Sequence, residues 1–277
     1  MKSPEYVSDH KSLSLLEEPG YLEFPGAQLY AVLHSTPHPL ARVLLTGPFA
    51  SERQNSYLPW VRWARYLAAR GMEVLRYDYR GVGESPGRFE EMTFKDWRED
   101  VQLLAEWLAN RTPALPLILH GLEIGALLAT HCFEAGMADA MLLWSPPSSA
   151  NQALRSTLLR WAGLEQLLKP DAERTTAADY IRQLEQGSAV EVEGYRWSPQ
   201  LWQESFDWKM PAGFRELHQE TGQGNRAVRI VDLPRKAAPL VKGGFVGYDE
   251  VKNFDWLFTE EASWIAARAA DCLEVRR

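Results

Sequence analysis

The sequence predicts an α/β fold in which a mostly parallel central sheet is flanked by helices. Short apolar runs alternate along the chain with segments of helical periodicity, in the order 42–46, 58–69, 72–77, 93–108, 115–120, 124–133 and 140–144. Strands that are buried on both faces form continuous apolar runs, whereas half-exposed strands alternate apolar and polar residues. The uninterrupted runs therefore predict parallel strands that helices cover on both faces.

Further elements lie before and after this pattern. Segments 21–24 and 28–33 are joined by Pro25-Gly26, a typical turn sequence, and together predict a hairpin. In the helix over 93–108, acidic residues lie toward the first turn, where the helix dipole favours them. The last predicted elements are two strands and a closing helix, at 227–233, 245–251 and 260–273.

Residues 148–214 interrupt the strand–helix rhythm after Pro146-Pro147. Leucine and tryptophan recur there at helical spacing, and the segment contains no clear core strand. We expect a mostly helical lid insertion packed over the carboxyl edge of the sheet. The predicted core then comprises residues 1–147 and 215–277.

Composition excludes several classes of protein. A net charge of −7 over 277 residues argues against a nucleic-acid partner. Cys132 and Cys272 are far apart and show no metal spacing, so neither a disulfide framework nor a metal site is expected. The first 20 residues lack the apolar run of a signal peptide, and no stretch has the length of a membrane span, which predicts a cytoplasmic protein. Eleven tryptophans predict either a lined groove or extra core packing.

The most informative segment follows the strand at 115–120, which runs through Gly121 and Gly125 directly into a helix. Small residues at these two positions let a tight strand–turn–helix close, and the residue between them is thrust out above the sheet. This arrangement resembles the nucleophile elbow of the α/β-hydrolase superfamily, whose central residue is serine. Here that position holds Glu123.

Two further loops are similar to the same superfamily. The run from Asp78 to Ser85 matches its Asp-x-Arg-Gly-x-Gly-x-Ser loop, and we expect the side chains of Asp78 and Arg80 to fix the loop. The Gly spacing lacks the third glycine of a dinucleotide-binding fingerprint, and no cofactor is expected. The resemblance also implies oxyanion-hole N–H donors near Phe49 and Ile124. A Glu123 carboxylate beside those donors would oppose an oxyanion.

The rest of a serine–histidine–acid triad is missing as well. Asp232 is available after the penultimate predicted strand, but no histidine occurs beyond His218 for it to orient. We expect His120, at the end of the strand before the elbow, and His131, in the following helix, to be packed structural residues. Because the triad acts as a unit, loss of its serine and histidine together predicts no acyl-enzyme chemistry.

Glu123 leaves three functions open. We favour a binding site without catalysis, in a scaffold retained for ligand recognition. Glu123 as a carboxylate nucleophile is a second interpretation, since Asp has that role in dehalogenase-type and epoxide-hydrolase relatives, which also use a histidine. General acid/base chemistry is a third, because burial under a tryptophan-rich lid would raise the pKa of Glu123.

Several blocks of the chain resemble the hydrolase-like proteins of bacterial exosortase-associated exopolysaccharide loci, whose elbow often lacks the serine too. These blocks include 47–55, 141–146, 191–199 and 254–258. The resemblance implies a role around polysaccharide assembly or protein sorting, with no established reaction. We expect a small-molecule or carbohydrate-linked ligand beside Glu123, in a pocket that also involves Pro48, Trp144, Ser145, Asp255 and Trp256.

Overall fold

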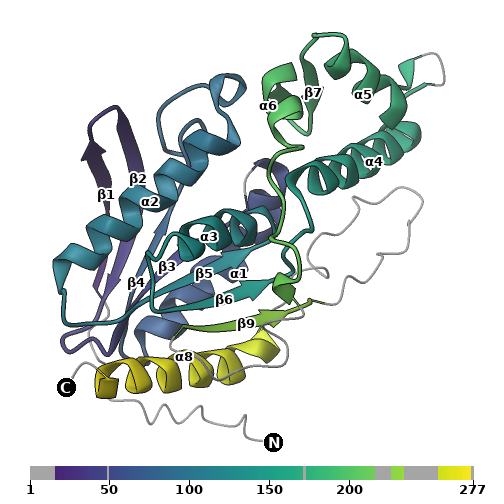
Figure 1. Cartoon of the computed structure of the whole chain (residues 1–277). Helices are drawn as coiled ribbons and strands as arrows, with labels where there is room; N and C mark the ends of the chain where they lie inside the picture. The colour runs from purple at the N-terminus through teal and green to yellow at the C-terminus, as the bar shows by residue number, and fades with distance from the viewer. Residues whose placement is uncertain (1–15, 49, 171–172, 216–225, 234–254, 276–277) are drawn as a thin grey trace, which may run out of the picture.

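A seven-stranded sheet forms the centre of the protein, in the order β1-β2-β4-β3-β5-β6-β9 (Figure 1). The computed structural model of the chain describes residues 16–48, 50–170, 173–215, 226–233 and 255–275. The strands of this sheet are β1 (Leu16–Phe24), β2 (Ala27–Ser35), β3 (Ala41–Thr46), β4 (Met72–Tyr77), β5 (Leu117–Leu122), β6 (Ala140–Trp144) and β9 (Ala227–Val231). The strands from β4 to β9 in this order pair in parallel, which confirms the predicted fold class.

The hairpin at the start of the sheet is longer than predicted. β1 and β2 pair antiparallel from Leu16 opposite Ser35 to Phe24 opposite Ala27. Gly26 has a φ of +80°, which closes the two-residue turn. The first half of β1 is largely exposed and therefore carries little apolar pattern to predict it from. β2 also pairs antiparallel with β4, and this pairing joins the hairpin to the parallel strands.

Helices cover both faces of the sheet (Figure 1). On one face, α2 and α3 pack in a buried cluster with Leu44, Leu119 and Leu143 of the strands. On the other face, α1 and α8 pack in a second cluster with Leu45 and Leu142. Successive side chains of one strand thus point to opposite faces of the sheet, and helices cover both faces. This explains why the parallel strands are continuous apolar runs. The helices are α1 (Ala50–Ala68), α2 (Phe94–Arg111), α3 (Ile124–Glu134) and α8 (Asp255–Val275), with a short 3₁₀ turn, η1 (Phe89–Glu91).

Two helices show how local sequence sets their ends. α1 begins at Ala50, eight residues before the predicted start at 58, and it contains Pro59. The helix was predicted from its apolar spacing, which begins only at residue 61. α2 begins after Thr93, whose hydroxyl and backbone N–H form a capping box with Asp96.

The segment 148–214 folds into helices and a separate two-stranded sheet. None of its described strands joins the main sheet, although the β7–β8 hairpin itself was not predicted. Figure 1 shows these elements gathered at one end of the molecule, and α4 contacts α3. Trp197 and Trp202 are buried in the same hydrophobic cluster as residues of α2 and α3. Its elements are α4 (Ala150–Leu168), α5 (Ala177–Glu185), β7 (Val190–Val192), β8 (Tyr195–Trp197) and α6 (Pro199–Glu204).

Three of the predicted elements lie toward the end of the chain. β9 and α8 occupy the predicted strand at 227–233 and the predicted helix at 260–273, with shifted ends. The predicted strand at 245–251 lies outside the described residues. Across the described ranges, the structure contains no helix with the length and apolar character needed to cross a membrane.

Candidate functional site

The turn between β5 and α3 has the geometry of a nucleophile elbow. Glu123 stands at its tip with φ 53° and ψ −121°, a backbone conformation that a side-chain-bearing residue rarely adopts. A Cβ on Gly121 would lie 2.3 Å from the Cα of Ala126, and a Cβ on Gly125 would lie 2.1 Å from the carbonyl oxygen of Thr46. Both positions therefore require glycine, because β3, β5 and α3 meet there without room for a side chain.

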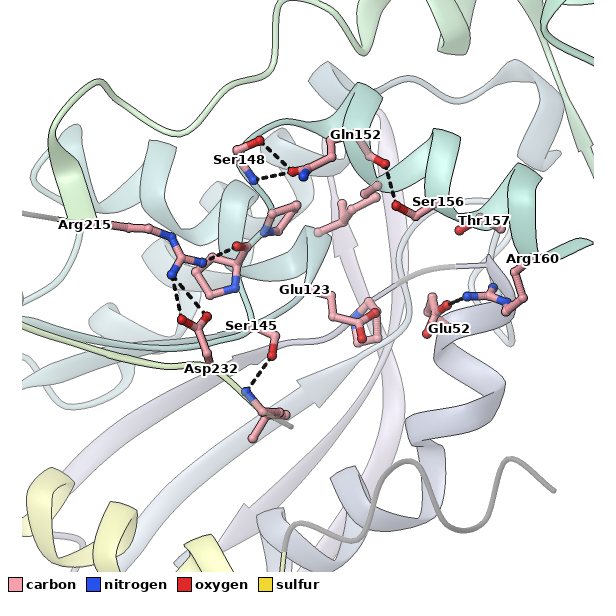
Figure 2. A pocket seen from close by; sticks show the side chains of 16 residues that line it. Glu52, Glu123, Ser145, Ser148, Gln152, Ser156, Thr157, Arg160, Arg215 and Asp232 are labelled. Atoms are coloured by element: carbon pink, nitrogen blue, oxygen red, sulfur yellow. Dashed lines mark hydrogen bonds and ion pairs between the residues drawn. The ribbon is translucent and has the colours of Figure 1, made fainter. Parts of the chain in front are cut away.

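Backbone hydrogen bonds hold Glu123 in this conformation. Its N–H donates to the carbonyl of Trp144 at the end of β6, at 2.9 Å. Its own carbonyl accepts from the N–H of Ala126 in α3, also at 2.9 Å. The neighbouring strand and the following helix thus fix the strained turn from both sides, and the Glu123 side chain lines a cavity (Figure 2).

This cavity lies at the carboxyl ends of four parallel strands. Pro48, Glu123, Ser145 and Asp232 follow β3, β5, β6 and β9, respectively, and all four line it. Ligands of open α/β sheets bind at this edge. The volume is about 460 Å³, within the range of small-molecule pockets. The remaining lining residues are Glu52, Ile124, Pro146, Pro147, Ser148, Gln152, Ala153, Ser156, Thr157, Arg160, Arg215 and Leu233.

On one side of the cavity, Arg160 of α4 joins three separate parts of the chain. Its Nη1 donates to Glu52 of α1. Its Nη2 and Nε donate to the two carboxylate oxygens of Glu193, in the β7–β8 turn, at 3.0 and 3.2 Å. Both carboxylates are largely buried, with side-chain exposures of 20% and 10%. This ion-pair network therefore connects the 148–214 segment to α1 beside the cavity.

On the other side, Arg215 connects the ends of two strands (Figure 2). Its Nη1 donates to both carboxylate oxygens of Asp232, after β9, at 3.1 and 3.0 Å. Its Nη2 donates to the carbonyl of Pro146, after β6, at 2.6 Å. The hydroxyl of Ser145 accepts from the N–H of Leu233 at 2.9 Å, so a second contact joins the same two loops.

Four of the residues predicted for the site come together here. Glu123, Ile124, Pro48 and Ser145 line the cavity, as does Asp232, the acid available after the penultimate predicted strand. The donor expected near Phe49 lies outside the described residues, and so does the side chain of Asp255.

The two tryptophans expected in the pocket lie elsewhere. Trp144 is fully buried against Trp60 and Trp63, on the face of the sheet that α1 and α8 cover. Successive residues of a strand point to opposite faces, and position 144 falls on the far one. Trp256, near the start of α8, is 62% exposed and is not part of the lining. The tryptophan-lined pocket is therefore corrected to a largely polar one.

The two arginines and the polar face of α4 were not predicted from the sequence. Gln152, Ser156 and Arg160 follow one another at intervals of four residues, so they lie on one side of the helix and line the cavity together. Polar residues at this spacing, in a helix near the carboxyl end of the sheet, could have predicted that side of α4 as part of the cavity lining. No local signal marks Arg215, because its two partners lie on loops distant in sequence.

The described histidines are not part of the cavity lining. His120 is fully buried, its Nδ1 lies 3.0 Å from the carbonyl oxygen of Leu142, and its ring packs 4.6 Å from that of Trp144. Burial lowers the pKa of His120 to about 3, so its ring is neutral at pH 7. His131 packs edge-on against Trp208, and burial lowers its pKa as well. Both are packed structural histidines, as expected.

The glycine-rich loop after β4 is held by ion pairs, as predicted. Asp78 accepts three hydrogen bonds from the guanidinium of Arg53, at 2.9, 2.7 and 2.7 Å, and one from the N–H of Glu84. Arg80 pairs with the buried Asp100 of α2. These residues support the loop and are absent from the cavity lining. Over the described ranges, no group of His, Cys, Asp or Glu side chains is arranged to hold a metal ion.

Parts of the chain are similar to a thioesterase and to a lipase. Over 81 residues, the chain is 36% identical to human palmitoyl-protein thioesterase ABHD10, covering 27% of this chain and 25% of that protein. Over 101 residues, it is 29% identical to lysophosphatidylserine lipase ABHD12 of Danio rerio, covering 35% and 26%, respectively. The chain thus spans a third or less of the length of these curated relatives.

Solved structures share the fold over almost the whole chain. A monoglyceride lipase variant of Saccharomyces cerevisiae superimposes with a TM-score of 0.56 at 15% identity, covering 94% of this chain and 98% of that one. An esterase of Pyrococcus furiosus gives a TM-score of 0.55 at 14% identity, covering 98% and 97%. At these identities the likeness establishes the α/β-hydrolase fold alone.

The family comparison extends across the elbow, α3 and the 148–214 segment. A family model described as "Serine aminopeptidase, S33" matches residues 60–220, which is more than half of the chain. Together with the elbow geometry and the strand order, this match shows that the chain belongs to the serine aminopeptidase S33 family of α/β-hydrolases.

Proposed function

We propose that this chain is a ligand-binding member of its family that forms no acyl-enzyme. The observation that carries the proposal is Glu123 itself, a carboxylate on the elbow turn that lines the cavity. Acyl transfer by a serine enzyme needs a hydroxyl at this position and N–H donors for an oxyanion beside it. A carboxylate offers no such hydroxyl, and its charge opposes the oxyanion.

The other two triad positions support the same proposal. Asp232 follows β9, where the superfamily has its acid, and both its oxygens accept from Arg215. A guanidinium stays protonated at any pH at which the protein is folded, so Arg215 offers no general base in place of an imidazole. The last histidine of the sequence, His218, precedes β9, whereas the triad histidine follows the acid in this superfamily.

We include in the proposal that residues 148–214 form a lid on a core of residues 1–147 and 215–277. α4 contributes Gln152, Ser156 and Arg160 to the cavity lining, and Arg160 reaches α1 through Glu52. One wall of the cavity therefore belongs to this segment, and a movement of the segment would change access to Glu123.

The resemblance to exosortase-associated proteins supports a bacterial, cytoplasmic setting around exopolysaccharide assembly. A small or carbohydrate-linked ligand agrees with a cavity lined by hydroxyl, amide and carboxylate groups. Neither of the two cysteines of the described residues forms a disulfide, which agrees with a reducing compartment.

A panel of p-nitrophenyl esters, from acetate to decanoate, tests the absence of acyl chemistry. We expect the purified protein to release p-nitrophenol no faster than buffer at every chain length. Turnover that depends on chain length and disappears in Glu123→Ala would overturn the proposal in favour of an active hydrolase. A mixed anhydride between the substrate's acyl group and the Glu123 carboxylate, formed with release of p-nitrophenolate and detected by mass spectrometry on the peptide that contains Glu123, would instead establish Glu123 as a nucleophile.

A further inference from the structure

The charged side chains around the cavity indicate which class of ligand it binds. Its described lining carries three carboxylates, those of Glu52, Glu123 and Asp232, and two guanidiniums, those of Arg160 and Arg215. Glu193, which pairs with Arg160, adds a fourth carboxylate next to the lining. Among the described residues, four negative groups against two positive ones favour a cation at the cavity and disfavour an anion.

The two arginines are already engaged by these acids. Arg160 donates to Glu52 and to both oxygens of Glu193. Arg215 donates to both oxygens of Asp232 and to the carbonyl of Pro146. An anionic ligand would have to displace one of these carboxylates before it could pair with either guanidinium. This cost disfavours phosphate- and carboxylate-bearing ligands.

The polar face of α4 adds more hydrogen-bond acceptors. The hydroxyl of Ser148 donates to the side-chain oxygen of Gln152 at 2.6 Å, and that of Ser156 donates to the Gln152 carbonyl at 3.0 Å (Figure 2). A hydroxyl that has donated its proton still has two lone pairs that can accept. The cavity therefore presents carboxylate and hydroxyl acceptors, which suit a ligand with many N–H and O–H donors.

We infer that the cavity binds a small, hydroxyl-bearing primary amine of the amino-sugar class, with its ammonium group against Glu123. This inference rests on the proposed function and names the ligand of the same site. An ammonium group has three donors and no acceptor, which matches the acceptors of the cavity. Ile124, Pro146 and Pro147 supply apolar surface for the C–H groups of a sugar ring. A volume of about 460 Å³ accommodates a ligand of this size.

Isothermal titration calorimetry with three sugars tests the inference. Glucosamine, N-acetylglucosamine and glucose differ at one substituent, and only glucosamine is a cation at pH 6. We expect glucosamine to bind about tenfold or more tighter than the other two, the difference that a hydrogen-bonded ion pair makes. Glu123→Gln should reduce glucosamine affinity to that of glucose. Glu134→Gln, on an exposed residue at the other end of α3, is the matched control and should bind like the parent protein.

A second measurement keeps the test independent of the variant's folding. Raising the pH to 9 deprotonates the glucosamine amine, so the parent protein should then bind glucosamine and glucose with similar affinity. Equal affinity for the two sugars at pH 6 would overturn the ammonium contact and leave the proposed function standing. Binding of none of the three at millimolar concentration would overturn the amino-sugar inference, whereas ester turnover would overturn the proposed function itself.

Discussion

Replacing Gly125 by alanine should destabilise the protein through a clash at the elbow. The new Cβ would lie 2.1 Å from the carbonyl oxygen of Thr46 and 2.3 Å from that of Gly47. Both contacts are with backbone atoms at the end of β3, which cannot rotate away as a flexible side chain can. The start of α3 would have to move by about 1 Å or more to restore normal van der Waals separation. Shifts of this kind typically cost 1–3 kcal/mol, and we expect about 3 kcal/mol because two carbonyls are struck.

The chain offers a matched control in Gly163 of α4. A Cβ there would meet no atom within 4 Å. Gly163→Ala removes conformational freedom from the unfolded chain without a clash, so it should stabilise by about 0.5–1 kcal/mol. Urea unfolding followed by tryptophan fluorescence measures both changes, with the parent protein as reference. A Gly125→Ala variant within 0.5 kcal/mol of the parent would refute the close approach of α3 to β3.

Three further changes have defined outcomes. Because the pKa of buried His120 is lowered to about 3, its contribution to stability is complete above its unfolded pKa of about 6.5 and is lost as pH falls toward 3. Between pH 7 and pH 5, the unfolding free energy should drop by about 2 kcal/mol because of this residue. His120→Gln should remove that drop, whereas His38→Gln, at an exposed position, should keep it. If both variants keep the full drop, the assignment to His120 is refuted. Arg160→Ala leaves Glu52 and Glu193 without their shared cation and should cost about 1–3 kcal/mol in urea unfolding, whereas Arg182→Ala on the surface of α5 should leave stability unchanged; equal effects would contradict the role of the network. Glu52→Gln keeps the shape of the side chain but weakens one ion pair, so its loss of stability should be smaller than that of Arg160→Ala, and a larger loss would show that Glu52 has another role.

Much of the fold was predictable because its signals are local. The parallel strands are short apolar runs, and the elbow requires glycine at positions 121 and 125 for close approaches that the structure then shows. The start of α2 also depends on local residues, since Thr93 and Asp96 form a capping box within one turn.

The features that escaped prediction depend on distant parts of the chain. β5 and β6 are buried at every position, so no alternation reveals which face a residue such as Trp144 occupies. Arg215 acquires its role only when the loops after β6 and β9 come together around it. The β7–β8 hairpin has three residues in each strand, too few for a periodic pattern to identify.

The central claim is that the chain lacks the base needed to activate a nucleophile at the elbow, and Glu123→Ser tests it directly. This variant restores the hydroxyl in the strained turn and removes the opposing carboxylate. The measurement is its rate of p-nitrophenyl butyrate hydrolysis, beside that of the parent protein. We predict that both rates equal the buffer rate, because Arg215 rather than a histidine is paired with Asp232. Hydrolysis by Glu123→Ser well above that rate would contradict the claim, since it would show that the chain already contains a working base for the elbow serine.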